Sequence, residues 1–269
     1  MLVKLLKHEF SATARTLLPV YAALLAMTLL MRLTNGVEYL HQLAEEYFLM
    51  GMFLSALSML YVCVITAVFV VTAILLIQRF YKNLLRDEGY LMHTLPVATW
   101  QLTAAKLIPA VFWCGVTGLA AFLSMNILFT VEPIRISDII DILTREGFSA
   151  CLLLLEGIAL VIFTLTKQIL QVYLSLAIGH LANSFRILWS IGAYIGISCI
   201  ANTITIVPLT FARFSTLVEH LITEVLALSN YPMIVMHISL LVPLLLSLLF
   251  GALYFTTTNW LMKHKLNLE

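Results

Sequence analysis

The stretch LMGMFLSALSMLYVCVITAVFVVTAILLI, residues 49–77, runs for 29 positions without a charged side chain. As a helix it would be about 44 Å long, because an α-helix rises about 1.5 Å per residue. The hydrocarbon core of a bilayer is only about 30 Å thick, and a helix pairs the backbone polar groups that lipid cannot satisfy. The stretch therefore predicts a transmembrane helix that tilts or protrudes from the bilayer.

The composition of the whole chain agrees with the prediction of a transmembrane helix. The 269 residues are 62% hydrophobic and 11% charged, whereas soluble domains carry about 25% charged residues. Too few polar side chains remain to cover a water-facing surface, which excludes a soluble enzyme. We predict an all-α polytopic membrane protein, a single transmembrane domain over residues 1–269, with spans at residues 17–31, 49–77, 107–129, 149–166, 187–208 and 234–257.

Basic residues near the ends of the spans indicate the orientation. Six spans place both termini on one side, and cytoplasmic ends carry an excess of Lys and Arg. With cytoplasmic termini, the inner set is Lys4, Lys7, Arg15, Arg79, Lys82, Arg86, Lys106, Lys167, Arg186, Lys263 and Lys265, and the outer set is Arg32, Arg135, Arg145 and Arg213. We therefore predict that the N- and C-termini are cytoplasmic.

Residues 1–16 predict a helix that lies in the membrane interface before the first span. Apolar side chains, among them Phe10, fall on one helical face, and basic ones, among them Lys4 and Lys7, fall on the other. Glu9 breaks this pattern, because it falls among the apolar positions. It either faces another protein surface, points sideways to a basic partner, or is a tolerated flanking residue.

Two segments on the predicted inner side are candidates for a docking surface. The longer one, about residues 79–98, is polar and aromatic, and Pro96 in it can open the next helix. The shorter one, residues 167–186, is amphipathic, and Gly179 predicts a break in it. On the outer side, apolar residues at helical spacing over residues 214–228 predict an external amphipathic helix before the last span.

Glu156 is the only acidic residue inside a predicted span. An unpaired charge at that depth costs several kcal/mol, so we expect Glu156 to be protonated or paired. In a functional interpretation it attracts a cationic substrate group or exchanges a proton. In a structural interpretation it fixes helix packing through a hydrogen bond to His237, Asn126 or a tyrosine.

The fifth predicted span is the most polar one and includes Asn202. It also contains Gly192-x-x-x-Gly196, a spacing that permits two helices to approach closely. We interpret this span as a candidate subunit interface or as the wall of a membrane path, and the alternative is ordinary packing inside one chain. Pro243 predicts a kink in the sixth span, because proline removes a helix hydrogen bond.

The sequence indicates no catalytic, cofactor or metal site. H-E-x-x-H and G-x-S-x-G are missing, and the seven histidines are scattered without metal-ligand spacing. The phosphate-binding pattern G-x-x-x-x-G-K-[S/T] is missing too, so this chain is not expected to bind ATP. The net charge of +1, without clustered basic residues, argues against a nucleic-acid partner.

Several motifs together resemble the permease subunits of type-2 ABC transporters. The run Arg86-Asp-Glu-Gly-Tyr-Leu-Met-His-Thr-Leu-Pro96 is followed ten residues later by Lys106. The motif Leu5-Leu-Lys-His-Glu-Phe10 precedes the first span, and Tyr173-Leu-Ser-Leu-Ala-Ile-Gly-His180 follows the fourth. With the six spans, these motifs extend the resemblance over most of the chain.

The resemblance implies a separate cytoplasmic subunit that binds ATP and Mg²⁺ and contacts this chain. The contacts it implies are the interfacial helix and the segment 79–98, which would act as a coupling helix. The residues concerned are Lys4, Lys7, Glu9 and Phe10 in the first element and Arg86, Asp87, Glu88, Gly89, Tyr90 and Leu91 in the second. The resemblance also implies a second permease subunit, identical or homologous, in a bacterial cell membrane, and an external re-entrant region at residues 214–228.

Taken together, these patterns predict the transmembrane subunit of an ATP-driven exporter for a hydrophobic or amphipathic compound, a peptide or a drug-like molecule. In that interpretation the chain is a permease and not an enzyme. One alternative is a secondary transporter or channel, which needs no ATP-binding partner. Another is an intramembrane enzyme, although no residue in the sequence recommends one.

Overall fold

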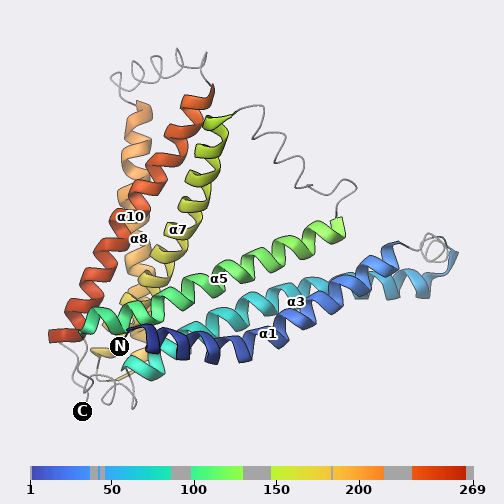
Figure 1. The fold of residues 1–269 in the computed structure, drawn as a ribbon, viewed down its shortest axis with the longest axis horizontal. Coiled ribbons are helices and arrows are strands. Elements are labelled where there is room, and N and C mark those ends of the chain that lie inside the picture. The colour runs from blue at the N-terminus through green and yellow to red at the C-terminus, as the bar shows by residue number, and fades with distance from the viewer. Residues whose placement is uncertain are drawn as a thin grey trace. The chain divides into compact units, whose positions relative to one another are not determined.

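The secondary structure is helical throughout the part of the chain that the computed structural model describes, residues 2–36, 42, 46–85, 98–129, 147–182, 184–214 and 232–264. The elements are α1 (Leu2–Asn35), α3 (Phe48–Phe80), the π-helix η1 (Tyr81–Leu85), α5 (Thr99–Phe129), α7 (Phe148–His180), α8 (Arg186–Phe214) and α10 (Pro232–His264). The six α-helices labelled in Figure 1 are long and apolar enough to cross a membrane. The predicted all-α fold with six membrane-spanning helices is confirmed.

The helices extend beyond the predicted spans, and α7 does so most clearly. It is 33 residues long, whereas the span predicted from apolar composition covers only residues 149–166. Its second half is amphipathic, and its inner face is covered, because Leu170, Tyr173 and Leu174 are buried. Gly179 does not break the helix as predicted, since α7 continues to His180.

Helix α1 runs without interruption through the predicted boundary between the interfacial helix, residues 1–16, and the first span, residues 17–31. Side chains on both sides of that boundary are buried, Thr13 before it and Leu17 after it. Packing therefore continues through the point at which the sequence changes from amphipathic to apolar. Pro19 and Pro243 both lie inside helices, in α1 and α10 respectively.

The helices belong to two units, each described by itself. Unit 1 comprises Met1–Arg79 and Ile108–Ile140, and unit 2 comprises Phe80–Leu107 and Asp141–Glu269. In unit 1, helices α1 and α3 and the C-terminal part of α5 surround a buried apolar cluster. Its members are Leu17, Tyr21, Leu24, Met31, Tyr61, Ile65, Val68, Trp113 and Leu128.

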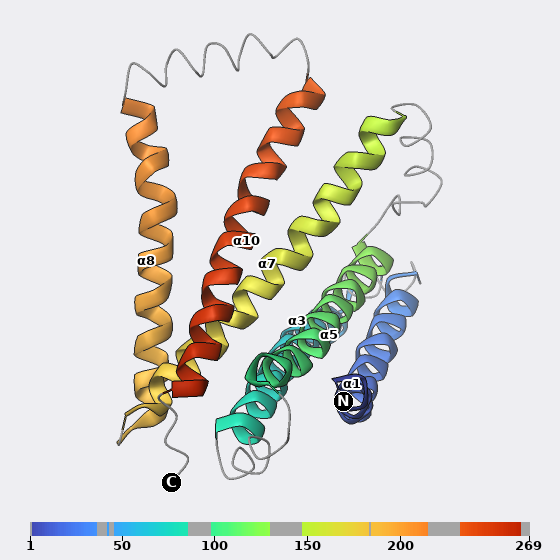
Figure 2. The same ribbon diagram turned by 60° about the vertical axis from the view of Figure 1, so that its left-hand side comes forward.

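In unit 2, helix α7 packs against both α8 and α10, and Figure 2 shows the three helices diverging from the end that holds the α7–α8 turn. An aromatic stack fills this end, where the rings of Phe80 and Tyr173 lie 3.7 Å apart and within 8° of parallel. The Tyr173 hydroxyl donates to the carbonyl of Lys106 at 3.4 Å. The Thr103 hydroxyl donates to the Asn259 side chain at 2.7 Å, which ties the start of α5 to α10.

Candidate functional site

Glu9, the residue that breaks the amphipathic pattern of the N-terminal segment, forms an ion pair inside unit 1. Its carboxylate accepts from Arg79 Nη1 at 3.2 Å, and only 8% of its side chain is exposed, against 24% for Arg79. Of the three readings of Glu9, the sideways basic partner is therefore confirmed. Because the carboxylate is buried, breaking its contact with Arg79 should cost more than breaking a surface pair.

The ion pair joins the two elements that the family resemblance implies as contacts for an ATP-binding subunit. Glu9 belongs to the interfacial segment, and Arg79 is the first residue of the predicted coupling segment, residues 79–98. Elsewhere on the interfacial segment, Lys7 is exposed, and Phe10 is half-buried with its ring edge-on to Phe112 at 5.2 Å. These two side chains divide between an exposed and a covered face, as the amphipathic pattern predicts.

Part of the predicted docking surface lies outside the described residues. This holds for Arg86, Asp87, Glu88, Gly89, Tyr90 and Leu91 and for the side chain of Lys4. Residues 215–228 of the predicted outer amphipathic helix also lie outside the described residues. The described part of the coupling segment is its beginning, residues 79–85, and residue 98 at its end.

That beginning is built into unit 2 by aromatic contacts that the sequence analysis missed. It forms the π-helix η1, a wide turn that is rare and often occurs at functional positions. Phe80 and Leu84 are fully buried, and the Tyr81 ring packs edge-on against His180 at 6.3 Å. The aromatic pair Phe80-Tyr81 directly after Arg79, followed by the aliphatic pair Leu84-Leu85, is the signal that could have indicated this packing.

The α7–α8 turn is unusually close-packed. A Cβ atom at Gly179 would lie 2.6 Å from the Ser190 nitrogen, 2.7 Å from the Arg186 carbonyl oxygen and still closer to the Ser190 hydroxyl. Phe185 follows in the left-handed region of the backbone, with φ of 52°, which is rare for a bulky residue. The turn thus depends on one glycine and one strained aromatic residue.

Glu156 is paired with His237 in unit 2. His237 Nδ1 lies 2.8 Å from Glu156 Oε2, and the two side chains are 21% and 22% exposed. The contact joins α7 to α10, and it identifies His237 among the partners that the sequence proposed. A carboxylate and an imidazole at this distance can share or exchange a proton, so the geometry serves both the structural and the functional interpretation.

Helix α8 leaves Gly192, Gly196 and Asn202 uncovered by the rest of unit 2. A Cβ atom at Gly192 or Gly196 would meet nothing within 4 Å, and Asn202 is exposed. Among the described residues, the two glycines therefore do not mediate close packing within one chain. The contacts of α8 to α7 come from other positions, such as the hydrogen bond of 2.6 Å from Gln171 Nε2 to the Ser198 hydroxyl.

Two groups of three hydroxyl side chains, which the sequence analysis did not predict, join the helices of unit 1. Each group takes one residue from α1, one from α3 and one from α5. The first group is Tyr21, Thr72 and Thr117, with oxygens 2.8 and 3.2 Å apart, and the second is Thr28, Tyr61 and Ser124, at 2.6 and 2.7 Å. The signal in the sequence is the seven-residue spacing of hydroxyls on the first and third spans, which places them on one helical face.

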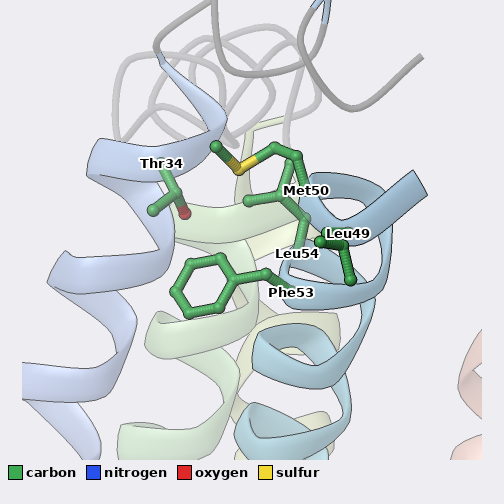
Figure 3. A pocket seen from close by; sticks show the side chains of 5 residues that line it. All are labelled: Thr34, Leu49, Met50, Phe53 and Leu54. Atoms are coloured by element: carbon green, nitrogen blue, oxygen red, sulfur yellow. The ribbon is translucent and has the colours of Figure 1, made fainter. Parts of the chain in front are cut away.

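Described residues line a groove on each unit. The first, in unit 1, has a volume of about 410 Å³ and is lined by Thr34, Leu49, Met50, Phe53 and Leu54. Figure 3 shows Thr34 on α1 facing the side chains from the start of α3. The Thr34 hydroxyl donates to the Met31 carbonyl of its own helix at 2.9 Å, so the groove offers an apolar surface.

The second groove lies in unit 2 at the α7–α8 turn and is larger, about 560 Å³. Its lining combines one cation with aromatic and aliphatic side chains, namely Tyr81, Phe185, Arg186, Ile187, Leu188 and Ile191. Within the described residues, no cluster of three or more His, Cys, Asp or Glu side chains could hold a metal ion. Comparisons with protein-family models, with curated proteins and with solved structures find no match to this chain.

Proposed function

We propose that this chain is the membrane-spanning permease subunit of an ATP-driven exporter and that a separate cytoplasmic subunit binds ATP. The observation that carries the proposal is the ion pair between Glu9 and Arg79. It fastens the N-terminal segment to the start of residues 79–98, and these are the two elements through which a type-2 ABC permease would receive force.

Coupling requires a rigid attachment between the cytoplasmic segment and the transmembrane helices. A partner that pushes on a cytoplasmic segment moves a transmembrane helix only if the segment is attached to it firmly. The largely buried carboxylate of Glu9 supplies such an attachment on one side of the Arg79–Phe80 peptide. The stack of Phe80 on Tyr173 supplies another within unit 2. Movement of the segment would therefore reach the spanning helices directly.

The proposed substrate is a hydrophobic or amphipathic compound, a peptide or a drug-like molecule. The apolar groove of Thr34, Leu49, Met50, Phe53 and Leu54 supports this class, because a polar molecule would find few hydrogen-bond partners there. We propose that this groove is on the outward side, in keeping with the distribution of basic residues.

The proposed exporter contains a second permease subunit, identical or homologous, and α8 is the face that supports this. Gly192 and Gly196 lie in the open, and Asn202 is exposed on the same helix. An amide side chain exposed on a membrane-spanning helix is stabilised by a partner that can hydrogen-bond to it, and small residues let such a partner approach closely.

The test is coupled ATP hydrolysis and transport after purification from the native membrane. We expect an ATP-binding chain to co-purify and candidate cargo to stimulate its ATP hydrolysis in liposomes. Glu9→Gln and Arg79→Gln should each lower transport several-fold while hydrolysis persists. The charge-swapped pair Glu9→Arg with Arg79→Glu should restore part of the loss, because the attraction is re-formed.

The matched control is Arg15→Gln, which removes an exposed cation from the same helix and should leave coupling intact. Charge reversal at Asp87 and Glu88 should also uncouple hydrolysis from transport. If no ATP-binding chain accompanies this protein, or if the Glu9 and Arg79 variants transport normally, the proposal is wrong.

A proton- or ion-driven secondary transporter is the second candidate, and the Glu156–His237 pair favours it. Ionisable residues in membrane-spanning helices commonly mark ion or proton pathways. This candidate predicts flux that follows an imposed proton gradient without ATP. It also predicts that Glu156→Gln abolishes that flux in a protein that still folds, whereas the ATP-driven exporter needs no such gradient.

A further inference from the structure

We infer that the groove at the α7–α8 turn is a binding site for an anionic phospholipid. Its volume of about 560 Å³ falls within the range of small-molecule sites, roughly 300 to 1,000 Å³. It lies where membrane-spanning helices α7 and α8 end and begin, so its mouth is at the level of lipid headgroups if these helices span the bilayer.

The polar end of the groove is cationic. Arg186 lines it, and a guanidinium binds phosphate oxygens in a forked geometry that a point charge lacks. Arg186 is also the first residue of α8, where the partial positive charge of a helix start adds to the attraction. An anionic headgroup, whose phosphodiester has no cationic group beside it, therefore complements this end better than a zwitterionic or cationic one.

The remaining lining continues into an apolar strip suited to an acyl chain. Ile187 and Ile191 lie one helical turn apart on α8, and both are exposed, to 69% and 52%. Ile195 continues the strip at the same spacing and is exposed as well. A free phosphate ion would leave this strip uncovered, whereas the acyl chain of a bilayer lipid would lie along it.

Aromatic side chains flank the headgroup position. Phe185 and Trp189 are exposed at the start of α8, and Tyr81 lines the groove from η1. Tyrosine and tryptophan are enriched at the membrane–water interface, because one part of the ring system is apolar and another is polar. The strained backbone at Phe185, with φ of 52°, persists only where the surroundings hold it, and such strain is concentrated at functional positions.

Close contacts join the described residues on either side of the turn. Gly179 brings the end of α7 against the first turn of α8, with no room for a side chain. The Trp189 amide donates to the Phe185 carbonyl at 3.1 Å, which fixes Phe185 as the residue before the helix. This inference is independent of the proposed transport function, because it concerns lipid held by unit 2 alone.

Native mass spectrometry of the purified full-length chain tests the site. The probes are phosphatidylglycerol and phosphatidylcholine of equal chain length, added at equal concentration. We expect phosphatidylglycerol to be retained preferentially, and Arg186→Gln to weaken that retention about fivefold, the effect of one basic residue near an anionic surface. The matched control is Lys263→Gln, another exposed cation of unit 2, which should leave retention unchanged.

Two further measurements distinguish a lipid in the groove from inorganic phosphate or a polypeptide. Inorganic phosphate in millimolar excess should not displace the lipid, and a photo-crosslinker at Ile191 should label lipid in native membranes. Circular dichroism verifies that each variant in the comparison keeps its helical content and is folded. Three results would overturn the inference: equal loss of lipid in both charge variants, displacement by inorganic phosphate, or labelling of a polypeptide instead of lipid at Ile191.

Discussion

The helices of unit 1 pack around a filled interior, whereas α7 and α8 of unit 2 leave most of their apolar surface without a protein neighbour, and α10 is intermediate with 22% of its most apolar stretch buried. In the most apolar stretch of α1 and of α3, 28% of the residues are buried, against 6% in α7 and in α8. Lipid provides no hydrophobic force between helices, so polar contacts and close packing must hold each unit. Unit 1 is held by its two groups of three hydroxyl side chains. Unit 2 relies on separate contacts, such as the Glu156–His237 pair and the close packing at Gly179.

Apolar helix surfaces therefore have different surroundings in the two units. In unit 1 it forms an interior, with Leu17 and Tyr61 almost completely buried. In unit 2 it remains available to lipid or to another chain. The following variants test this difference, ordered by the decreasing effect of the first substitution in each test on the stability of the protein.

Gly179→Ala should be the most destabilising of these substitutions, by about 3 kcal/mol. The new methyl group would meet backbone atoms of Arg186 and Ser190, which cannot move aside as a flexible side chain does. The measurement is thermal unfolding in detergent. The control is Gly157→Ala on the same helix, where a Cβ meets nothing within 4 Å and helix propensity predicts a gain of up to about 1 kcal/mol. Equal effects of both substitutions would contradict the close packing of the turn.

Ser124→Ala should destabilise unit 1 by about 1–2 kcal/mol, because both Thr28 and Tyr61 lose the hydroxyl they share. Hydrogen exchange should then become faster in α1 and α3. Ser58→Ala is the control, since that exposed hydroxyl bonds only to the Leu54 carbonyl of its own helix. A loss at Ser124 no larger than at Ser58 would show that the hydroxyl groups do not join the helices.

Glu156→Gln should change the stability of unit 2 by less than about 1 kcal/mol, because an amide still hydrogen-bonds to His237. Glu156→Leu should cost more, about 1–3 kcal/mol, since it leaves the imidazole without its partner. Unfolding in detergent separates the two variants. Transport measured on the Gln variant then reports on function alone, and equal stability losses would mean that the contact at 2.8 Å does not hold the helices.

Gly192→Leu should have almost no effect on unfolding of the isolated chain, within about 0.5 kcal/mol, because its surroundings are open. If α8 is the seam between two permease subunits, the same substitution should weaken self-association about tenfold, or about 1.4 kcal/mol. Analytical ultracentrifugation in detergent measures the proportions of monomer and self-associated protein. Gly157→Leu, also in the open, is the control, and unchanged association of the Gly192 variant would remove α8 from the interface.

Apolar composition predicted the number and type of the helices, but not their ends or their partners. The length of α7 was underestimated because Lys167 ends the apolar run, although buried residues such as Tyr173 keep the helix packed to His180. Likewise, a basic partner was one of three interpretations of Glu9, and the sequence could not choose Arg79, which lies 70 residues away. Such a pairing depends on how α1 and α3 lie against each other, which periodicity within one helix does not contain.

The two groups of three hydroxyl side chains in unit 1 were missed for a related reason. Ser, Thr and Tyr are unremarkable in a membrane helix one at a time, because a hydroxyl can bond to its own helix, as Thr28 also does with the Leu24 carbonyl. Only the joint spacing of hydroxyls on three helices identifies them as a shared contact. In the same way, the open position of Gly192 and Gly196 could not be read from their spacing, which fits packing inside one chain equally well.

The wide turn of η1 has a consequence for whatever follows it. A π turn is closed by a hydrogen bond one residue longer than that of an α-helix, and one residue corresponds to about 100° of rotation about the helix axis. Tightening Tyr81–Leu85 to α geometry would therefore rotate the chain beyond Leu85 by about that angle relative to α3. A shift of one hydrogen-bond register would then be enough to change which side of η1 faces a molecule bound to it.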